Sequence, residues 1–191
     1  MILYLCVITV SAFAIAVIVT LTEQLKFLST LGLVWLGVVA VILVDAITAS
    51  LCRALPMRCA NIEKSIFKVG QKEKLFYEKC KIRKWKDLIP EIGHFTGFRK
   101  NKIAQPNSVE YIDRFLLEIA YGQIVHTVSV LTGFGILFLF PFFDNWLKIS
   151  IPVAAINGIL NVFPTFVLRY NSYKLVILKK NLCKKQRKTA V

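Results

Sequence analysis

The sequence predicts an all-α integral membrane protein that crosses the bilayer with four helices. Hydrophobic residues make up 56% of the 191 residues and the mean hydropathy is +0.60, which is more apolar than a soluble domain of this length. The apolar residues gather in four segments of about 20 residues or more, enough helix to cross about 30 Å of hydrocarbon. A period-2 alternation of the kind that marks membrane strands is absent from the sequence.

These segments predict helices over about 2–22, 27–52, 115–143 and 149–169, in a single membrane domain covering 1–191. The first segment lacks a basic stretch before its apolar run, so we expect it to stay in the protein rather than to be cleaved as a signal peptide. An insertion of about 60 residues, 53–113, separates the second helix from the third, and a basic tail, 170–191, follows the fourth.

The net charge of +14 is concentrated in two places. Residues 53–102 hold fourteen Lys and Arg, and residues 169–188 hold eight more without an acidic residue. Basic residues beside membrane spans mark the cytoplasmic side. We therefore expect a multi-pass membrane protein with its insertion and both termini in the cytoplasm. Anionic lipid headgroups account for the basic residues, and no nucleic-acid partner is expected.

Within the insertion, residues 62–85 have the pattern of a broken amphipathic helix, with Ile, Phe, Leu and Trp interleaved with Lys. The string KIRKWKDLIPE, which begins at Lys81, overlaps the end of this stretch. One reading is a solvated loop that faces anionic lipid, and the other is part of a site in which Arg83 or Lys86 binds phosphate or carboxylate. Farther on, Ser108 begins a capped helix start, so the third helix should begin before the membrane.

Polar side chains interrupt the apolar segments at one predicted depth. Asp45, His126 and Asn161 each lie eight residues from a charged residue at the inner end of their helix, which is about 12 Å of helix. We expect these three side chains to face one cavity, with Glu118 and Arg169 one layer nearer the cytoplasm. A polar group buried between helices can also serve only as an interhelical contact. Asn157 is a further polar residue of the fourth segment.

The five cysteines do not have the spacing of a metal site or of a CxxC motif. Four of them fall at or inside the expected cytoplasmic face, where thiols stay reduced. We expect neither a disulfide, nor a bound metal, nor a cofactor.

Three motifs follow one another along the chain: Tyr77-x5-Arg83-Lys84-Trp85-Lys86-Asp87-x2-Pro90, Glu118-x7-His126 and Asn161-x2-Pro164-x4-Arg169-Tyr170-Asn171. In this order they resemble the glycosyl-4,4'-diaponeurosporenoate acyltransferase family, small bacterial membrane proteins of staphyloxanthin-type carotenoid synthesis, which implies a location in the bacterial cell membrane. The resemblance covers about residues 55–180. The chain departs from the family at Tyr121 and Gln123, where the family carries Arg and Glu, and around the third motif, at Leu168 and residues 172–174.

The resemblance implies transfer of a fatty acyl group from a carrier or coenzyme A thioester to a hydroxyl of a lipid-linked acceptor in the membrane. His126 would be the general base, since imidazole titrates near neutrality. Asp45 or Glu118 would orient it, and Asn161 would donate to the oxyanion. The expected substrate-binding residues, with phosphate contacts from the cationic ones, are Arg83, Lys84, Trp85, Lys86, Asp87, Arg169, Tyr170 and Asn171.

Another reading is a non-enzymatic membrane protein, such as an immunity or assembly factor on the same scaffold. The neutral residues Tyr121 and Gln123 favour this alternative. A small multidrug exporter fits less well, because the insertion is long and the helices carry no Glu in the membrane. A methyltransferase is not supported by any cofactor-binding pattern in the sequence.

Overall fold

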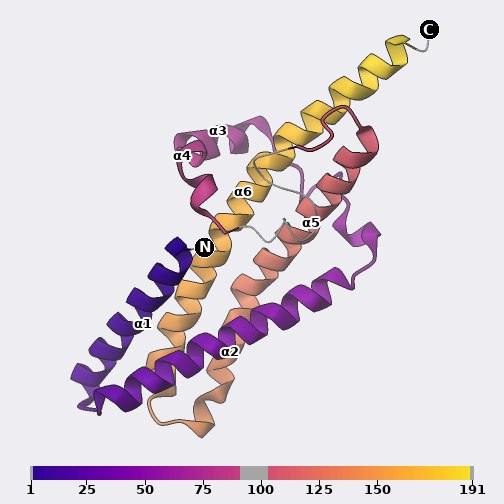
Figure 1. Ribbon diagram of the computed structural model, residues 1–191. Coiled ribbons are helices and arrows are strands. Elements are labelled where there is room, and N and C mark those ends of the chain that lie inside the picture. Colours follow the sequence, from indigo (N-terminus) through magenta and orange to yellow (C-terminus); the bar gives the residue numbers. More distant parts are fainter. Residues whose placement is uncertain (1, 91–102, 190–191) are drawn as a thin grey trace. The chain divides into compact units, whose positions relative to one another are not determined.

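The computed structural model describes residues 2–90 and 103–189, and every regular element in these ranges is a helix (Figure 1). In these ranges four helices are long and apolar enough to cross a membrane. They include α1 (Ile2–Glu23), α2 (Phe27–Arg53), α5 (Val109–Thr132) and α6 (Trp146–Thr189). The all-α class and the four membrane-length helices predicted from the sequence are thus confirmed.

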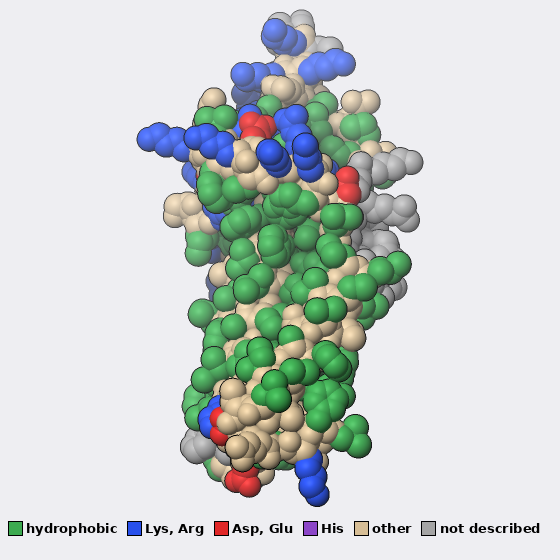
Figure 2. All heavy atoms as spheres, turned by 90° about the vertical axis from the view of Figure 1, so that its left-hand side faces the viewer, with side chains coloured by type: hydrophobic (Ala, Val, Ile, Leu, Met, Phe, Trp, Pro, Cys, Tyr) green, Lys and Arg blue, Asp and Glu red, His purple; other side chains and the backbone are tan. Residues whose placement is uncertain are grey.

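The chain divides into two compact units, and α5 and α6 each contribute to both. Unit 1 contains Met1–Ala54 and Val125–Phe163, and unit 2 contains Leu55–Ile124 and Pro164–Val191. Figure 2 shows hydrophobic side chains covering the helices of unit 1 on the visible face, as expected for surfaces that meet lipid. Lys and Arg side chains gather on elements of unit 2.

In unit 1, α1 and α2 form a hairpin whose core contains small residues. Ala12 and Ala16 of α1 are buried in the same cluster as Val34 and Val38 of α2. Small side chains let two membrane helices approach closely, which strengthens their packing where lipid offers no hydrophobic driving force. An ion pair between Glu23 and Lys148 joins the α1–α2 connection to the start of α6.

The third membrane segment differs from the single helix expected over 115–143. It begins earlier, at Val109, where Ser108 Oγ accepts the Tyr111 N–H at 3.1 Å, so the predicted cap is present. The α-helix ends at Thr132 and continues as a 3-10 helix, η4 (Gly133–Phe142), which contains Pro141. Glycine and proline are poor α-formers, which explains the change of helix type within an apolar run.

The fourth segment is also longer as a helix than its apolar stretch. It was expected to end near residue 169, but α6 continues to Thr189 through the basic tail. Hydrophobicity limits the part that crosses a membrane, whereas Lys, Arg, Gln and Leu all favour a continued helix in water.

Between α2 and α5, unit 2 contains η1 (Met57–Ala60), α3 (Gln71–Lys79), α4 (Ile82–Trp85) and η2 (Lys86–Leu88). Of the broken amphipathic helix expected over 62–85, only the part from Gln71 is helical, and residues 62–70 form turns and irregular chain. The helix breaks at Lys81, which has a left-handed backbone with φ of 53°. Beneath these elements, α5 and α6 pack through a core of Ile112, Phe115, Leu116, Ile119 and Leu175.

Candidate functional site

In unit 1, three helices contribute polar side chains to one hydrogen-bonded cluster. Asp45 of α2 accepts hydrogen bonds from two α6 amides, at 3.3 Å from Asn157 Nδ2 to Oδ1 and at 3.1 Å from Asn161 Nδ2 to Oδ2. His126 of α5 lies 2.8 Å from Asn161, Nδ1 to Oδ1. The structure therefore brings together the carboxyl, imidazole and amide that the sequence places at one depth. We call Asp45, His126, Asn157 and Asn161 the polar cluster.

The hydrogen bonds of Asn161 fix the orientation of its amide. Its Nδ2 lies within 3.1 Å of Asp45 Oδ2 and of the Asn157 carbonyl oxygen, and both of these atoms only accept when the carboxyl is ionised. The opposite atom of the amide, Oδ1, must then accept from His126. The proton of a neutral imidazole consequently sits on Nδ1, and Nε2 keeps a free electron pair. Within the described ranges, Nε2 of His126 makes no hydrogen bond to the protein.

A glycine makes room for the cluster. A Cβ added at Gly133 would lie 2.7 Å from Asn157 Nδ2, closer than such atoms approach, and 3.4 Å from Val41 Cγ2. The absence of a side chain at Gly133 thus lets the Asn157 amide reach Asp45. At Gly135, two residues further along η4, an added Cβ would meet nothing within 4 Å.

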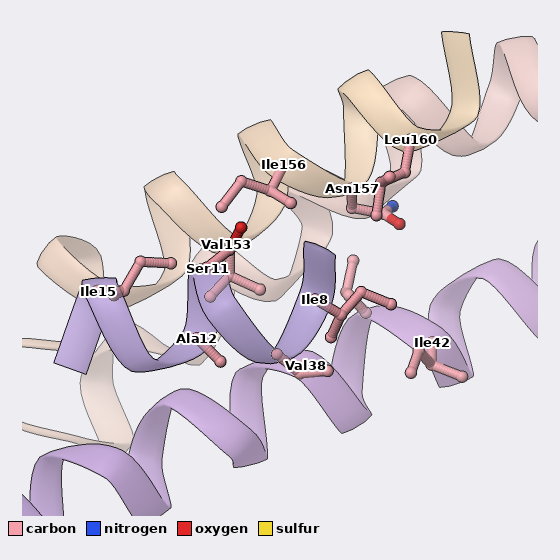
Figure 3. Close-up of a pocket in the computed structure, with 11 residues that line it drawn as sticks. Ile8, Ser11, Ala12, Ile15, Val38, Ile42, Val153, Ile156, Asn157 and Leu160 are labelled. Atoms are coloured by element: carbon pink, nitrogen blue, oxygen red, sulfur yellow. The ribbon is translucent and has the colours of Figure 1, made fainter. Parts of the chain in front are cut away.

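An apolar groove runs beside the cluster, between α1, α2 and α6 (Figure 3). Its lining is aliphatic apart from Ser11 and Asn157, and the Asn157 amide also belongs to the polar cluster. Its volume of about 40 Å³ is close to that of a single water molecule, so the groove holds no more than a small part of a hydrocarbon chain. The aliphatic lining consists of Ile8, Ala12, Ile15, Val38, Val41, Ile42, Val153, Ile156 and Leu160.

In unit 2, Arg169 is the centre of a second network. Its Nε and Nη2 donate to the two carboxylate oxygens of Glu73 at 2.5 and 3.0 Å. Nη1 donates to the Ile66 carbonyl at 2.9 Å and to Gln123 Oε1 at 3.3 Å, and Nη2 donates to the Lys68 carbonyl at 3.4 Å. A guanidinium has five N–H groups, so these contacts engage all of them.

The carboxylate of Glu73 is held in its ionised form. The hydrogen bond from Arg169 lowers the pKa of Glu73 below its ordinary value, and the Tyr77 hydroxyl, which donates to Oε1 at 2.6 Å, acts in the same direction. The pKa of Tyr77 is raised, first by burial and then by its bond to Glu73. Tyr77 packs against the ring of Phe166, with 5.3 Å between centroids. This network fastens α3 to α6.

Arg83 joins the basic string to α6. Its Nε donates to the Tyr170 hydroxyl at 2.8 Å, and its Nη2 lies 2.9 Å from Glu78 Oε1. The bond to Tyr170 is the main reason why the pKa of Arg83 is raised. Its side chain is 66% exposed, so an edge of the guanidinium still faces outward.

The other predicted site residues lie at or near the surface of unit 2. Trp85 donates its indole N–H to the Cys80 carbonyl at 2.9 Å, and Lys86 pairs with Asp87 at 3.7 Å. Lys84 is exposed, whereas Glu118 and Asn171 are partly buried on α5 and α6. Glu91, the last residue of the string, lies outside the described residues.

Sequence reasoning gave no role to Glu73. Its spacing of four residues from Tyr77 on α3 indicates a pair, but its partner Arg169 lies 96 residues away. The departures from the family pattern have partners in unit 2 as well. The Tyr121 hydroxyl donates to the Leu55 carbonyl at 2.7 Å, and Gln123 is buried beside Arg169.

Comparison with known proteins gives one match. A family model described as glycosyl-4,4'-diaponeurosporenoate acyltransferase matches residues 60–181, more than half of the chain. This range includes Glu73, Arg83, His126, Asn161 and Arg169 and begins after Asp45. No curated protein and no solved structure matches the chain.

Proposed function

The chain belongs to the glycosyl-4,4'-diaponeurosporenoate acyltransferase family, and on this premise we propose that it transfers a fatty acyl group to a hydroxyl of a lipid-linked sugar in the membrane. The observation that carries the proposal is the hydrogen-bonded series Asp45–Asn161–His126. A base whose ring is oriented by a second group, itself oriented by a third, is the arrangement that activates hydroxyl nucleophiles in acyl transfer.

In the proposed reaction, His126 Nε2 removes the proton from the acceptor hydroxyl as its oxygen attacks the carbonyl carbon of an acyl thioester. The new ester C–O bond forms, the C–S bond breaks, and the imidazolium returns its proton to the leaving thiolate. Asp45, two hydrogen bonds from the ring, stabilises the positive charge on His126 through Asn161. A role in orienting His126 through Asn161 would explain why a carboxyl is kept inside a membrane helix.

The role of Asn161 changes from the one expected from sequence. Its amide nitrogen already donates to Asp45 and to Asn157. In this proposal Asn161 is therefore a positioning residue for His126 rather than a donor to the oxyanion. The family membership supports a fatty acyl substrate.

The proposal includes a topology in which the 53–113 insertion and both termini lie in the cytoplasm of a bacterial cell. The distribution of Lys and Arg supports this arrangement. The Glu23–Lys148 ion pair supports it too, because two connections on the same side of the membrane must be able to meet.

The test is a comparison of lipid extracts from cells that make a glycosylated carotenoid acid and express the wild type, His126→Gln or Thr127→Ala. Thr127 is the exposed neighbour of His126 and serves as the control. Mass spectrometry should find a new acyl ester with the wild type and the control, and about 10²- to 10⁴-fold less with His126→Gln. No acyl ester from wild-type cells that contain acceptor and donor would instead favour a non-enzymatic membrane protein.

A further inference from the structure

A second groove lies in unit 2, outside the polar cluster. One wall is the segment 62–70, which precedes α3, and the other is the face of α6 between Ser172 and Arg187. Buried Phe67 and Leu116 lie among its lining residues, and Tyr173 adds a second aromatic ring. A concave site with an apolar interior and polar groups at its edge is typical of small-molecule sites.

The charged side chains around this groove are mostly positive. Five cationic side chains line it against one carboxylate, Glu63, and they are Lys68, Lys179, Lys180, Lys184 and Arg187. Lys179 pairs with Asp113 at 2.6 Å. Lys68, Lys180, Lys184 and Arg187 are exposed, and none of them forms an ion pair with a residue of the described ranges. The lining therefore favours a ligand with several negative charges.

The cations expected from the sequence to bind phosphate are differently placed. Arg169 uses its five N–H groups within the protein, so it has none left for a ligand while Glu73 is bound. Two of these bonds go to the carbonyls of Ile66 and Lys68, which belong to the wall of the groove. Arg169 thus positions the segment that presents Lys68.

We propose that this groove binds the nucleotide part of a coenzyme A thioester, which would be the acyl donor; the inference rests on the proposed function. Coenzyme A carries a diphosphate and a further phosphate, whose charge suits the surplus of cations. Its purine ring would lie against Phe67 and Tyr173. Lys68 from one wall and Lys184 from the other would contact phosphates from opposite sides.

A phospholipid headgroup fits these observations less well. It carries about one negative charge for attraction to basic residues at a membrane surface, whereas four exposed cations meet around a single cavity here. Surface cations that only attract anionic lipid would also not require a recess with buried aromatic and aliphatic residues. An acyl carrier protein would need a wider contact surface than a groove of this kind.

The experiment uses the full chain in nanodiscs of zwitterionic lipid and measures binding of free coenzyme A, which has no acyl chain to partition into lipid. The groove variant is Lys68→Gln with Lys184→Gln. The control, Lys64→Gln with Lys188→Gln, removes the same charge from exposed residues of the same two elements that do not line the groove. We expect the Kd of coenzyme A to rise on the order of tenfold in the groove variant and to change less than about twofold in the control.

Equal weakening in both variants would overturn the site, since it would show only a diffuse charge effect. Absence of coenzyme A binding by the wild type would overturn it too. The site would also be wrong if the groove variant weakened binding to anionic vesicles or to acyl carrier protein but left coenzyme A binding unchanged. His126→Gln should bind coenzyme A like the wild type. If coenzyme A binds through the groove but no acyl ester ever forms, the proposed function fails; if the ester forms without such binding, the groove proposal fails.

Discussion

Arg169 and Glu73 form a two-point ion pair, in which Nε and Nη2 of the guanidinium meet Oε1 and Oε2 of the carboxylate at 2.5 and 3.0 Å. The pair links α6 to α3, which follows a segment with few regular elements. Since the same guanidinium also binds the carbonyls of Ile66 and Lys68, it holds the 62–73 segment at three residues, in addition to the burial of Phe67.

The first prediction is that Arg169→Lys loosens this segment. A lysine has one nitrogen and cannot reproduce the planar fork. We expect the free energy of local opening at residues 62–73 to fall by roughly 1–3 kcal/mol, measured by hydrogen exchange in nanodiscs. As the control, Lys74→Gln breaks the Lys74–Glu78 pair on the surface of α3 and should change exchange little. Unchanged protection of residues 62–73 from exchange in Arg169→Lys would show that Arg169 does not hold this segment in place.

The second prediction concerns acid. Because the pKa of Glu73 is lowered in the folded chain, its ionisation stabilises the fold above its ordinary value of 4.5, and this stabilisation is lost as the pH falls through the lowered value. Exchange at residues 62–73 should therefore rise when the pH is taken below about 4.5, after correction for intrinsic rates. In Glu73→Gln the segment should already be loosened at pH 7, and this acid-dependent step should disappear. A step of the same size in Glu73→Gln would assign it to other carboxyls.

The third prediction concerns topology. In cells, a cysteine at Asn107 should be protected from a membrane-impermeant thiol reagent, whereas a cysteine at Asp144, in the short connection before α6, should react. The basic residues of the insertion motivate the first expectation. Native Cys6 and Cys80 are exposed and must first be replaced by serine. Labelling at position 107 but not at 144 would show that the protein has the opposite orientation in the membrane.

The sequence was sufficient to predict that Asp45, His126 and Asn161 lie close together. The depths of Asp45, His126 and Asn161 follow from counting residues to the charged ends of their helices, and few other polar groups compete for contacts in an apolar span. Helix type and length were harder to obtain. Hydropathy measures how apolar a stretch is, so it registers neither the change to a 3-10 helix at Gly133 nor the continuation of α6 beyond its apolar part.

The Arg169 network was not predictable in the same way. Unit 2 offers many cations and several carboxylates, and the choice of Glu73 as partner depends on how α3 folds back to α6. The position of Arg169 beside Tyr170 and Asn171 suggested a substrate contact, whereas its hydrogen bonds go to the protein. Charge spacing along a chain does not reveal such long-range pairs.

The fourth prediction tests the basic string that begins at Lys81. Arg83→Lys should lower acyl-ester formation severalfold, because one ammonium cannot bond Tyr170 and Glu78 in the geometry of the guanidinium. Lys84→Arg, a change at the exposed neighbour, should leave ester formation unchanged. Both proteins should reach the membrane in wild-type amounts, judged by immunoblot. Wild-type ester levels in Arg83→Lys would make the string a solvated loop that faces lipid.

The last prediction uses two glycines of η4 to test the polar cluster without altering its members. Gly133→Ala places a Cβ 2.7 Å from Asn157 Nδ2, so Asn157 must move and its 3.3 Å hydrogen bond to Asp45 is broken. Asn161 Nδ2 then loses its 3.3 Å hydrogen bond to Asn157 Oδ1, which helps to hold its amide. We expect ester formation to fall on the order of tenfold to a hundredfold, as for a base that is slightly misplaced. Gly135→Ala adds the same methyl group where an added Cβ meets nothing within 4 Å, and activity should stay near that of the wild type. Equal activity of the two variants, at equal amounts of folded protein, would show that catalysis does not depend on the Asp45–Asn157 contact.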